Sequence, residues 1–338
     1  MFKTLLLIAA ATFATIAGLA QQTQNSLITL SNDTIAISIL PEVGGRLVRA
    51  SLCGKPNILK SDSTQWNESP DKRPGLTPRG MFKAYNGHIT WLSPQSEWWA
   101  HQDSFPLLKS NHAQWPPDTY LEFSPFRIVR QTSHEIVLTG PASPFSKMQL
   151  TKTFRISGNK VFVSAAAKNT STDTVSWGLW HNTRMSGWDA VFVQANETDL
   201  RKTNYMRRAE LRKPELHYAD GFYSYEAVRP ETPGGFMSKS FFDVASPLIA
   251  GHHGNQWLII RSAAIPAQSI HPEQARIELY IENTTRPERD LQELEMQFAY
   301  ETIAPGASIE ATETWEIFPA GNSADKNELR TELKKLLK

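Results

Sequence analysis

Short apolar or alternating segments follow one another along most of this chain, and no amphipathic helix separates them before residue 322. The segments are rich in β-branched and aromatic residues and are bounded by Gly, Pro, Asn and Asp, a pattern typical of strands joined by turns. Strands that follow each other without helices between them favour an antiparallel sandwich over a parallel α/β sheet. The expected strands are Leu27–Leu30, Thr34–Leu40, Leu47–Leu52, Glu135–Thr139, Gln149–Ile156, Val161–Lys168, Val175–Trp180, Ala190–Val193, Gln256–Arg261, Arg276–Ile281, Leu291–Tyr300 and Ser308–Ile317.

Two long excursions interrupt this pattern. Residues 61–118 are rich in Pro, Trp, Ser and Gly, whereas residues 198–233 are polar, basic and rich in Tyr. Loops of this length in a compact domain are usually functional or disordered, and the Trp content of the first argues against disorder. Because no repeat and no linker divides the chain, we expect one all-β domain over residues 21–338. It should end in a helix over residues 323–338 with Ser323 as its N-cap.

The first twenty residues have the features of a secretory signal peptide. Lys3 provides a positive start, residues 5–17 are apolar, and small residues precede Gln21. The apolar stretch is short for a membrane span, which needs about 20 residues. We therefore expect cleavage near Ala20/Gln21 and a periplasmic or secreted protein without a membrane anchor.

Composition excludes several classes of protein. The formal net charge of +1 lacks the basic excess typical of nucleic-acid binding, and 40% hydrophobic residues are too many for a disordered chain. The single cysteine, Cys53, excludes a disulfide framework, and we expect it to be buried on a strand. The pair His252-His253 has no suitably spaced third ligand, so we expect no metal. The sequence lacks a Gly-rich phosphate loop, and we expect no cofactor.

A segment with a histidine, an acid and three tryptophans, residues 86–99, is the first candidate for sugar binding. Alternation along its strand would place His88 and Thr90 on one face and Trp91 on the other. Polar side chains could then bind hydroxyl groups while an indole stacks on a sugar face. The alternative is a Trp-rich loop that plugs one end of the sandwich. The candidate binding residues in this segment are His88, Trp91, Glu97, Trp98 and Trp99.

Two later strands carry candidates for acid–base chemistry. His181 lies at the end of an apolar strand, close to Arg184, and an imidazole titrates near neutral pH. In residues 291–297 the period of two places Glu293 and Glu295 on one face. Two carboxylates on a buried face are costly unless they line a polar cleft. The alternatives are a core histidine and a solvated strand face.

The motifs and their order along the chain resemble those of the galactose-mutarotase-like superfamily, which includes aldose 1-epimerases. The similar segments are, in chain order, the opening hairpin 40–52 with Arg46, the histidine segment 180–183, the glutamate segment 294–297 and the final turn 303–308. Within the superfamily the chain looks closest to a bacterial group with a domain of unknown function. The residues that carry this likeness are Gly87, His88, Trp91, Pro94 and Trp98.

The resemblance implies an antiparallel β-supersandwich, a sugar or oligosaccharide as the partner, and catalysis of ring opening. Glu295 would take the proton of the anomeric hydroxyl while His181 protonates the ring oxygen. The two residues would face the same cleft, with Glu293, Arg184, His88 and Trp91 around it. Arg46 and His88 would replace the Arg and second His that bind sugar in the family.

Two other functions stay open, because this fold also serves non-catalytic and lyase-associated proteins. One is a non-catalytic glycan-binding module. The other is an accessory protein of a polysaccharide lyase or hydrolase, which would use Tyr223 or Tyr225 together with the basic residues 207–213.

Overall fold

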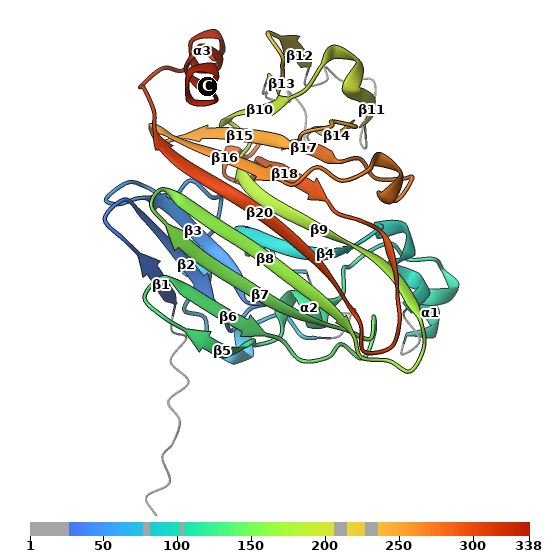
Figure 1. The fold of residues 1–338 in the computed structure, drawn as a ribbon. Helices are drawn as coiled ribbons and strands as arrows, with labels where there is room; N and C mark the ends of the chain where they lie inside the picture. The colour runs from blue at the N-terminus through green and yellow to red at the C-terminus, as the bar shows by residue number, and fades with distance from the viewer. Residues whose placement is uncertain (1–26, 77–81, 102–104, 206–214, 227–235) are drawn as a thin grey trace, which may run out of the picture.

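Antiparallel strands in two layers form the framework of the chain (Figure 1). The computed structural model describes residues 27–76, 82–101, 105–205, 215–226 and 236–338. Every strand pair in it is antiparallel, and each layer is a ten-stranded sheet, so the antiparallel sandwich expected from the sequence is confirmed. The expected signal peptide and the basic residues 207–213 lie outside the described residues.

The first sheet has the strand order β1-β2-β3-β4-β9-β18-β17-β14-β11, and β19 pairs with β9 beside this path. Its strands are β1 (Ile28–Ser31), β2 (Ile35–Leu40), β3 (Arg46–Leu52), β4 (His88–Ser93), β9 (Val175–Ser186), β11 (Leu200–Tyr205), β14 (Phe236–Phe242), β17 (Ile277–Asn283), β18 (Leu291–Gln297) and β19 (Glu301–Ile303).

The second sheet has the order β12-β13-β10-β15-β16-β20-β8-β7-β6-β5. Its strands are β5 (Arg127–Gln131), β6 (Glu135–Thr139), β7 (Met148–Ser157), β8 (Lys160–Asn169), β10 (Ala190–Gln194), β12 (Leu216–Ala219), β13 (Phe222–Tyr225), β15 (Leu248–His253), β16 (Gln256–Ser262) and β20 (Ser308–Pro319).

The main hydrophobic core lies between the inner faces of the two sheets. Leu294 and Met296 of β18 belong to one buried cluster with Ile249 of β15 and Leu258 of β16. Side chains alternate between the two faces of a strand. Every residue of β18 after Leu291 is nevertheless buried, so the outer face of the first sheet is covered as well.

Short helical segments lie within the first excursion and at later points of the chain, which ends in a longer helix. The short helices are η1 (Ser63–Gln65), η2 (Pro70–Lys72), η3 (Gln95–His101), α1 (Pro106–Ser110), α2 (Thr119–Phe123), η4 (Glu197–Asp199), η5 (Ala267–Ser269) and η6 (Pro287–Arg289). The C-terminal helix is α3 (Lys326–Leu336), and among the described helices none is long and apolar enough to span a membrane.

The expected C-terminal helix is present, but its first turn starts later than predicted. Asp325 is the N-cap, and its carboxylate accepts hydrogen bonds from the backbone amides of Asn327 and Glu328. The hydroxyl of Ser323 instead accepts a hydrogen bond from the backbone amide of Asp325, just before the helix begins. Leu329 and Leu333 are buried, and they fix α3 against the outer face of the second sheet.

Two further sequence expectations are corrected by the fold. Cys53 is exposed in a turn, and its thiol lies 3.1 Å from the carbonyl oxygen of Asn32, so it is not a buried strand residue. The second excursion was expected to be irregular, but its described part contributes strands. The strands absent from the sequence prediction are β5, β11, β12, β13, β14, β15 and β19.

Candidate functional site

A cleft of about 760 Å³ lies over the outer face of the first sheet. We call it the outer cleft. Its volume falls within the range of about 300–1,000 Å³ that is typical of small-molecule sites. The strand residues in its floor are Arg184, Met237, Lys239, Tyr280, Glu282, Leu291, Glu293 and Glu295. The aromatic residues in its wall are Phe82, Trp91, Trp115 and Trp180.

Strand register brings the polar residues of the floor together. Arg184 of β9 pairs with Glu293 of β18, and Asn182 pairs with Glu295. Cross-strand partners in an antiparallel sheet share a face, so these four side chains point to the outer side. The sequence prediction that Glu293 and Glu295 share a face is confirmed by this register.

Arg184 and Glu293 form a buried ion pair in the floor. The Arg184 Nε lies 2.7 Å from the Glu293 Oε1, and its Nη1 donates to the Asn86 side-chain oxygen at 3.3 Å. Burial alone would raise the pKa of Glu293, but the charge of Arg184, the polar side chain of Asn182 and the charge of Lys239 outweigh it and lower that pKa. Glu293 is therefore ionised at neutral pH.

Lys239 joins two more carboxylates in the floor. Its Nζ lies 2.6 Å from an oxygen of Glu278 and 2.6 Å from one of Glu295, and 4.3 Å from the centre of the Trp180 ring. Burial raises the pKa of Glu295 well above its usual value, and the charges of Glu278 and Glu293 add to this against the attraction of Lys239. Neighbouring carboxylates of one strand thus differ in their affinity for protons.

Tryptophans form the wall of the outer cleft. The Trp91 and Trp180 rings meet edge to face at 4.8 Å, and Trp98 stacks behind Trp180 at 6.2 Å. Trp115 lies 6.3 Å from Trp91, and its exposed fraction of 47% distinguishes it from the other three, which are buried. Trp115 is therefore the indole of this group that is available to stack on a ligand.

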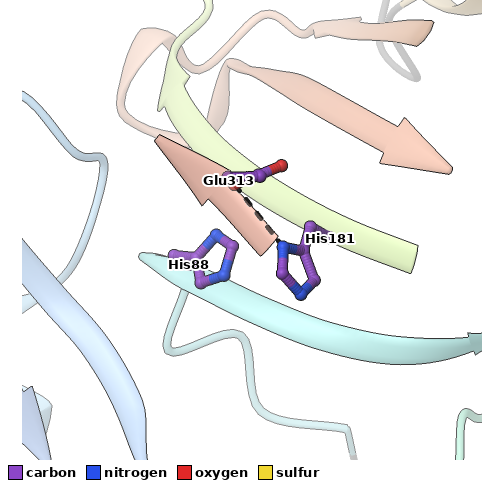
Figure 2. A group of neighbouring side chains, drawn as sticks. All are labelled: His88, His181 and Glu313. Atoms are coloured by element: carbon purple, nitrogen blue, oxygen red, sulfur yellow. Dashed lines mark ion pairs between the residues drawn. The ribbon is translucent and has the colours of Figure 1, made fainter. Parts of the chain in front are cut away.

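His181 lies on the inner face of β9, so the expectation that it shares a cleft with Glu295 is wrong. Its register partner on β18 is the core residue Met296, and its side chain is fully buried. Figure 2 shows His181 beside His88 and Glu313. Adjacent residues of a strand point to opposite faces. Asn182 therefore occupies the outer position, where the resemblance had implied a histidine.

His88 is also an inner-face residue and not a sugar ligand of the outer cleft. The predicted alternation is present, since His88 and Thr90 pair with Thr183 and His181, while Trp91 pairs with Trp180. The polar face of β4, however, is the one that faces the second sheet. Burial lowers the pKa of His88 well below its usual value, with His181 adding to the effect, so the imidazole is neutral at pH 7.

Three other predicted binding residues do not line the outer cleft. Arg46 is buried, and its Nη2 lies 2.5 Å from the Glu122 Oε1. Glu97 accepts a hydrogen bond from the Tyr300 hydroxyl at 3.0 Å. Trp98 donates its indole N–H to the carbonyl oxygen of Leu92 at 2.8 Å, so it supports the wall from behind.

The remaining aromatic candidates are also engaged elsewhere. Trp99 stacks on His112 with ring centres 3.9 Å apart. Tyr223 and Tyr225 belong to β13 of the second sheet and lie outside the outer cleft. The Tyr223 hydroxyl donates to the Glu197 carbonyl at 2.7 Å, and burial raises the pKa of Tyr225 to about 12. Neither is placed to act as the base of a lyase in this cleft.

Sequence reasoning missed several residues of the outer cleft. Lys239 is the clearest, because a lone lysine within the apolar and Ser-rich segment 236–242 is a signal for a paired buried charge. Trp115 had no signal of its own among the tryptophans of the first excursion. Trp180, Tyr280 and Glu282 of the cleft were also missed, as was Glu278, the buried partner of Lys239.

The fold is a galactose-mutarotase-like β-sandwich, so the resemblance in fold inferred from the sequence is confirmed. The model of a family described as a domain of unknown function, DUF4380, matches residues 26–318, so the chain belongs to that family. No curated protein matches the chain.

Solved structures share the fold at low sequence identity. A galactose mutarotase-like protein from Clostridium acetobutylicum is 11% identical, with a TM-score of 0.53 over 86% of this chain and 94% of its own. One from Lactobacillus casei is 12% identical, with a TM-score of 0.52 over 87% of this chain and 100% of its own. The Slr1438 protein from Synechocystis is 13% identical, with a TM-score of 0.52 over 92% of this chain and 100% of its own.

Proposed function

We propose that the protein binds a sugar or oligosaccharide in the outer cleft. The observation that carries this proposal is the combination of an exposed indole, Trp115, with fixed ionic groups on one face of a mutarotase-like sheet. An indole packs against the C–H face of a pyranose, while carboxylate and guanidinium groups bind its hydroxyls in fixed directions.

A specific observation favours a second step, the interconversion of anomers. Glu293 and Glu295 are two residues apart on one strand face, roughly 7 Å along the strand. Their surroundings move their pKa values in opposite directions. Paired groups that differ in this way are the usual basis for separate acid and base roles.

The proposed reaction uses both carboxyl groups and no cofactor. Ionised Glu293 accepts the proton of the anomeric hydroxyl, and protonated Glu295 donates a proton to the ring oxygen as the bond from that oxygen to C1 breaks. C1 becomes an aldehyde carbon, and rotation about the C1–C2 bond exposes its other face. Ring closure then returns both protons in reverse. This scheme replaces the expected pair of His181 and Glu295.

Removing the exposed indole tests the binding proposal. A glycan array identifies the sugar, and calorimetry then compares Trp115→Ala with the intact protein. We expect the dissociation constant to rise about 5- to 30-fold, which corresponds to a lost aromatic contact of about 1–2 kcal/mol.

The matched control for Trp115 is Trp188→Ala. Trp188 is exposed to a similar extent, 41%, but it does not line the outer cleft. Its substitution should leave sugar affinity unchanged. Equal weakening by both substitutions, or no bound glycan at all, would refute sugar binding at this site.

We also propose that the protein is exported, on the basis of Lys3, the apolar residues 5–17 and the small residues before Gln21. Expressed in a bacterial host, the exported protein should have an N-terminus near Gln21 by mass spectrometry. Recovery of the chain in the cytoplasm only, with Met1 retained, would contradict this prediction.

A further inference from the structure

A second cluster of functional groups lies between the sheets, beneath the floor of the outer cleft. His88 of β4 and His181 of β9 lie on the inner face of the first sheet, and Glu313 extends toward them from β20 of the second. Figure 2 shows the two imidazoles side by side and the Glu313 carboxylate next to His181. The exposed fractions of the three residues are 1%, 0% and 0%.

These side chains have unsatisfied polar atoms within the described part of the chain. The His88 Nε2, both His181 ring nitrogens and the Glu313 Oε1 have no hydrogen-bond partner there. The closest approach between His181 and Glu313 is 3.6 Å, from Nδ1 to Oε2. Burying polar atoms without partners is costly, and native proteins rarely do so without a functional reason.

We propose that His88, His181 and Glu313 bind a divalent first-row transition metal ion, with Zn²⁺ as the best candidate. Each residue offers one ligand atom, and the three atoms lie within 4.8 Å of one another. Two imidazoles and one carboxylate form a donor set that binds zinc in proteins. Ligand atoms around tetrahedral zinc lie about 3.3 Å apart, so the side chains would draw together by roughly an ångström.

Neighbouring side chains hold two of the ligands in orientation for a metal. The His88 Nδ1 lies 2.9 Å from the Thr183 hydroxyl, which leaves Nε2 directed into the cluster. The Trp315 indole N–H donates to the Glu313 Oε2 at 2.9 Å and leaves Oε1 available. Hydrogen bonds from outside the ligand set are a regular feature of protein metal sites.

With three protein ligands, the tetrahedron would keep a fourth position for a water molecule, and the bound ion would link the two sheets. Its ligands come from three distant segments, which explains why ligand spacing along the sequence gave no signal. The strands of His88 and His181 also carry Trp91, Trp180 and Arg184 on their outer faces. Metal binding at the inner face would therefore fix the strands that form the outer cleft.

The test is elemental analysis of the full chain, purified after growth with added Zn²⁺. We expect about one equivalent of metal per chain in the intact protein. Metal content should fall to background in Glu313→Gln and His181→Ala. His253→Ala is the control, because His253 pairs with Asp189 at the surface and lies outside the cluster. It should retain the metal.

The ligand variants could lose metal simply because they misfold, so a milder variant and a measurement of the metal's position complete the test. Thr183→Val preserves shape but removes the hydrogen bond to His88, and zinc affinity should fall about 10- to 100-fold. Anomalous diffraction at the zinc edge should give a peak between the three residues. Absence of metal above background, a peak elsewhere, or unchanged affinity in Thr183→Val would overturn the proposal.

Discussion

Substitution of Glu295 by Gln is expected to slow mutarotation about 10²- to 10⁴-fold, the usual loss when a general acid or base is removed. Gln has the shape of Glu but cannot donate a carboxylic proton to the ring oxygen. The side chain lies at the floor of the outer cleft, beside Lys239. Polarimetry on a reducing sugar that the protein binds measures the rate, and calorimetry should show that binding is largely retained.

The pH profile of this activity follows from the two pKa directions. The ionised form of Glu293 disappears as the pH falls through its lowered pKa. The protonated form of Glu295 disappears as the pH rises through its raised pKa. The rate should therefore be bell-shaped, with its acid limb below the usual glutamate pKa and its alkaline limb well above it. Glu295→Gln should abolish the alkaline limb of any residual rate.

The matched control is Glu310→Gln, which makes the same chemical change at an exposed position of β20 outside the cleft. It should leave both rate and binding intact. If Glu295→Gln mutarotates at the rate of the intact protein, Glu295 is no acid, and the cleft is better described as that of a non-catalytic glycan-binding module.

The sandwich was predictable because the strand signal is local. The alternating segment Gln149–Ile156 carries Leu150, Phe154 and Ile156 on one face, and that face of β7 is buried. The strands that were missed lack this contrast. β5 has exposed residues throughout, and β14 has polar residues on both faces, so neither shows a clear period.

The site was only partly predictable, because β9 and β18 are buried on both faces. The two faces of β9 have similar mean polarity. The outer face carries Trp180, Asn182 and Arg184, and the inner face carries His181 and Thr183. Alternation assigns residues to two faces, but it does not say which face meets the other sheet. Only the partners supplied by distant segments decide this, and here they place His181 inside.

The second large effect concerns the ion pair between Arg46 and Glu122, which links β3 to helix α2. Both side chains are almost fully buried, at 1% and 2% exposure, and the Nη2–Oε1 distance is 2.5 Å. The other Glu122 oxygen accepts the Trp91 indole N–H at 2.7 Å. The pair thus supports the wall of the outer cleft, although neither residue lines it.

Arg46→Met is expected to destabilise the fold by about 3–5 kcal/mol, because it leaves the Glu122 carboxylate buried without its partner. Urea unfolding measures the loss. The double variant Arg46→Met/Glu122→Gln removes both charges and keeps an acceptor for Trp91, so it should recover a large part of the stability. Two results would contradict this account: a loss of less than about 1 kcal/mol in the single variant, which is the range of exposed pairs, or a double variant that is no more stable than the single one. In either case the role of Arg46 is side-chain packing alone and not the neutralisation of a buried charge.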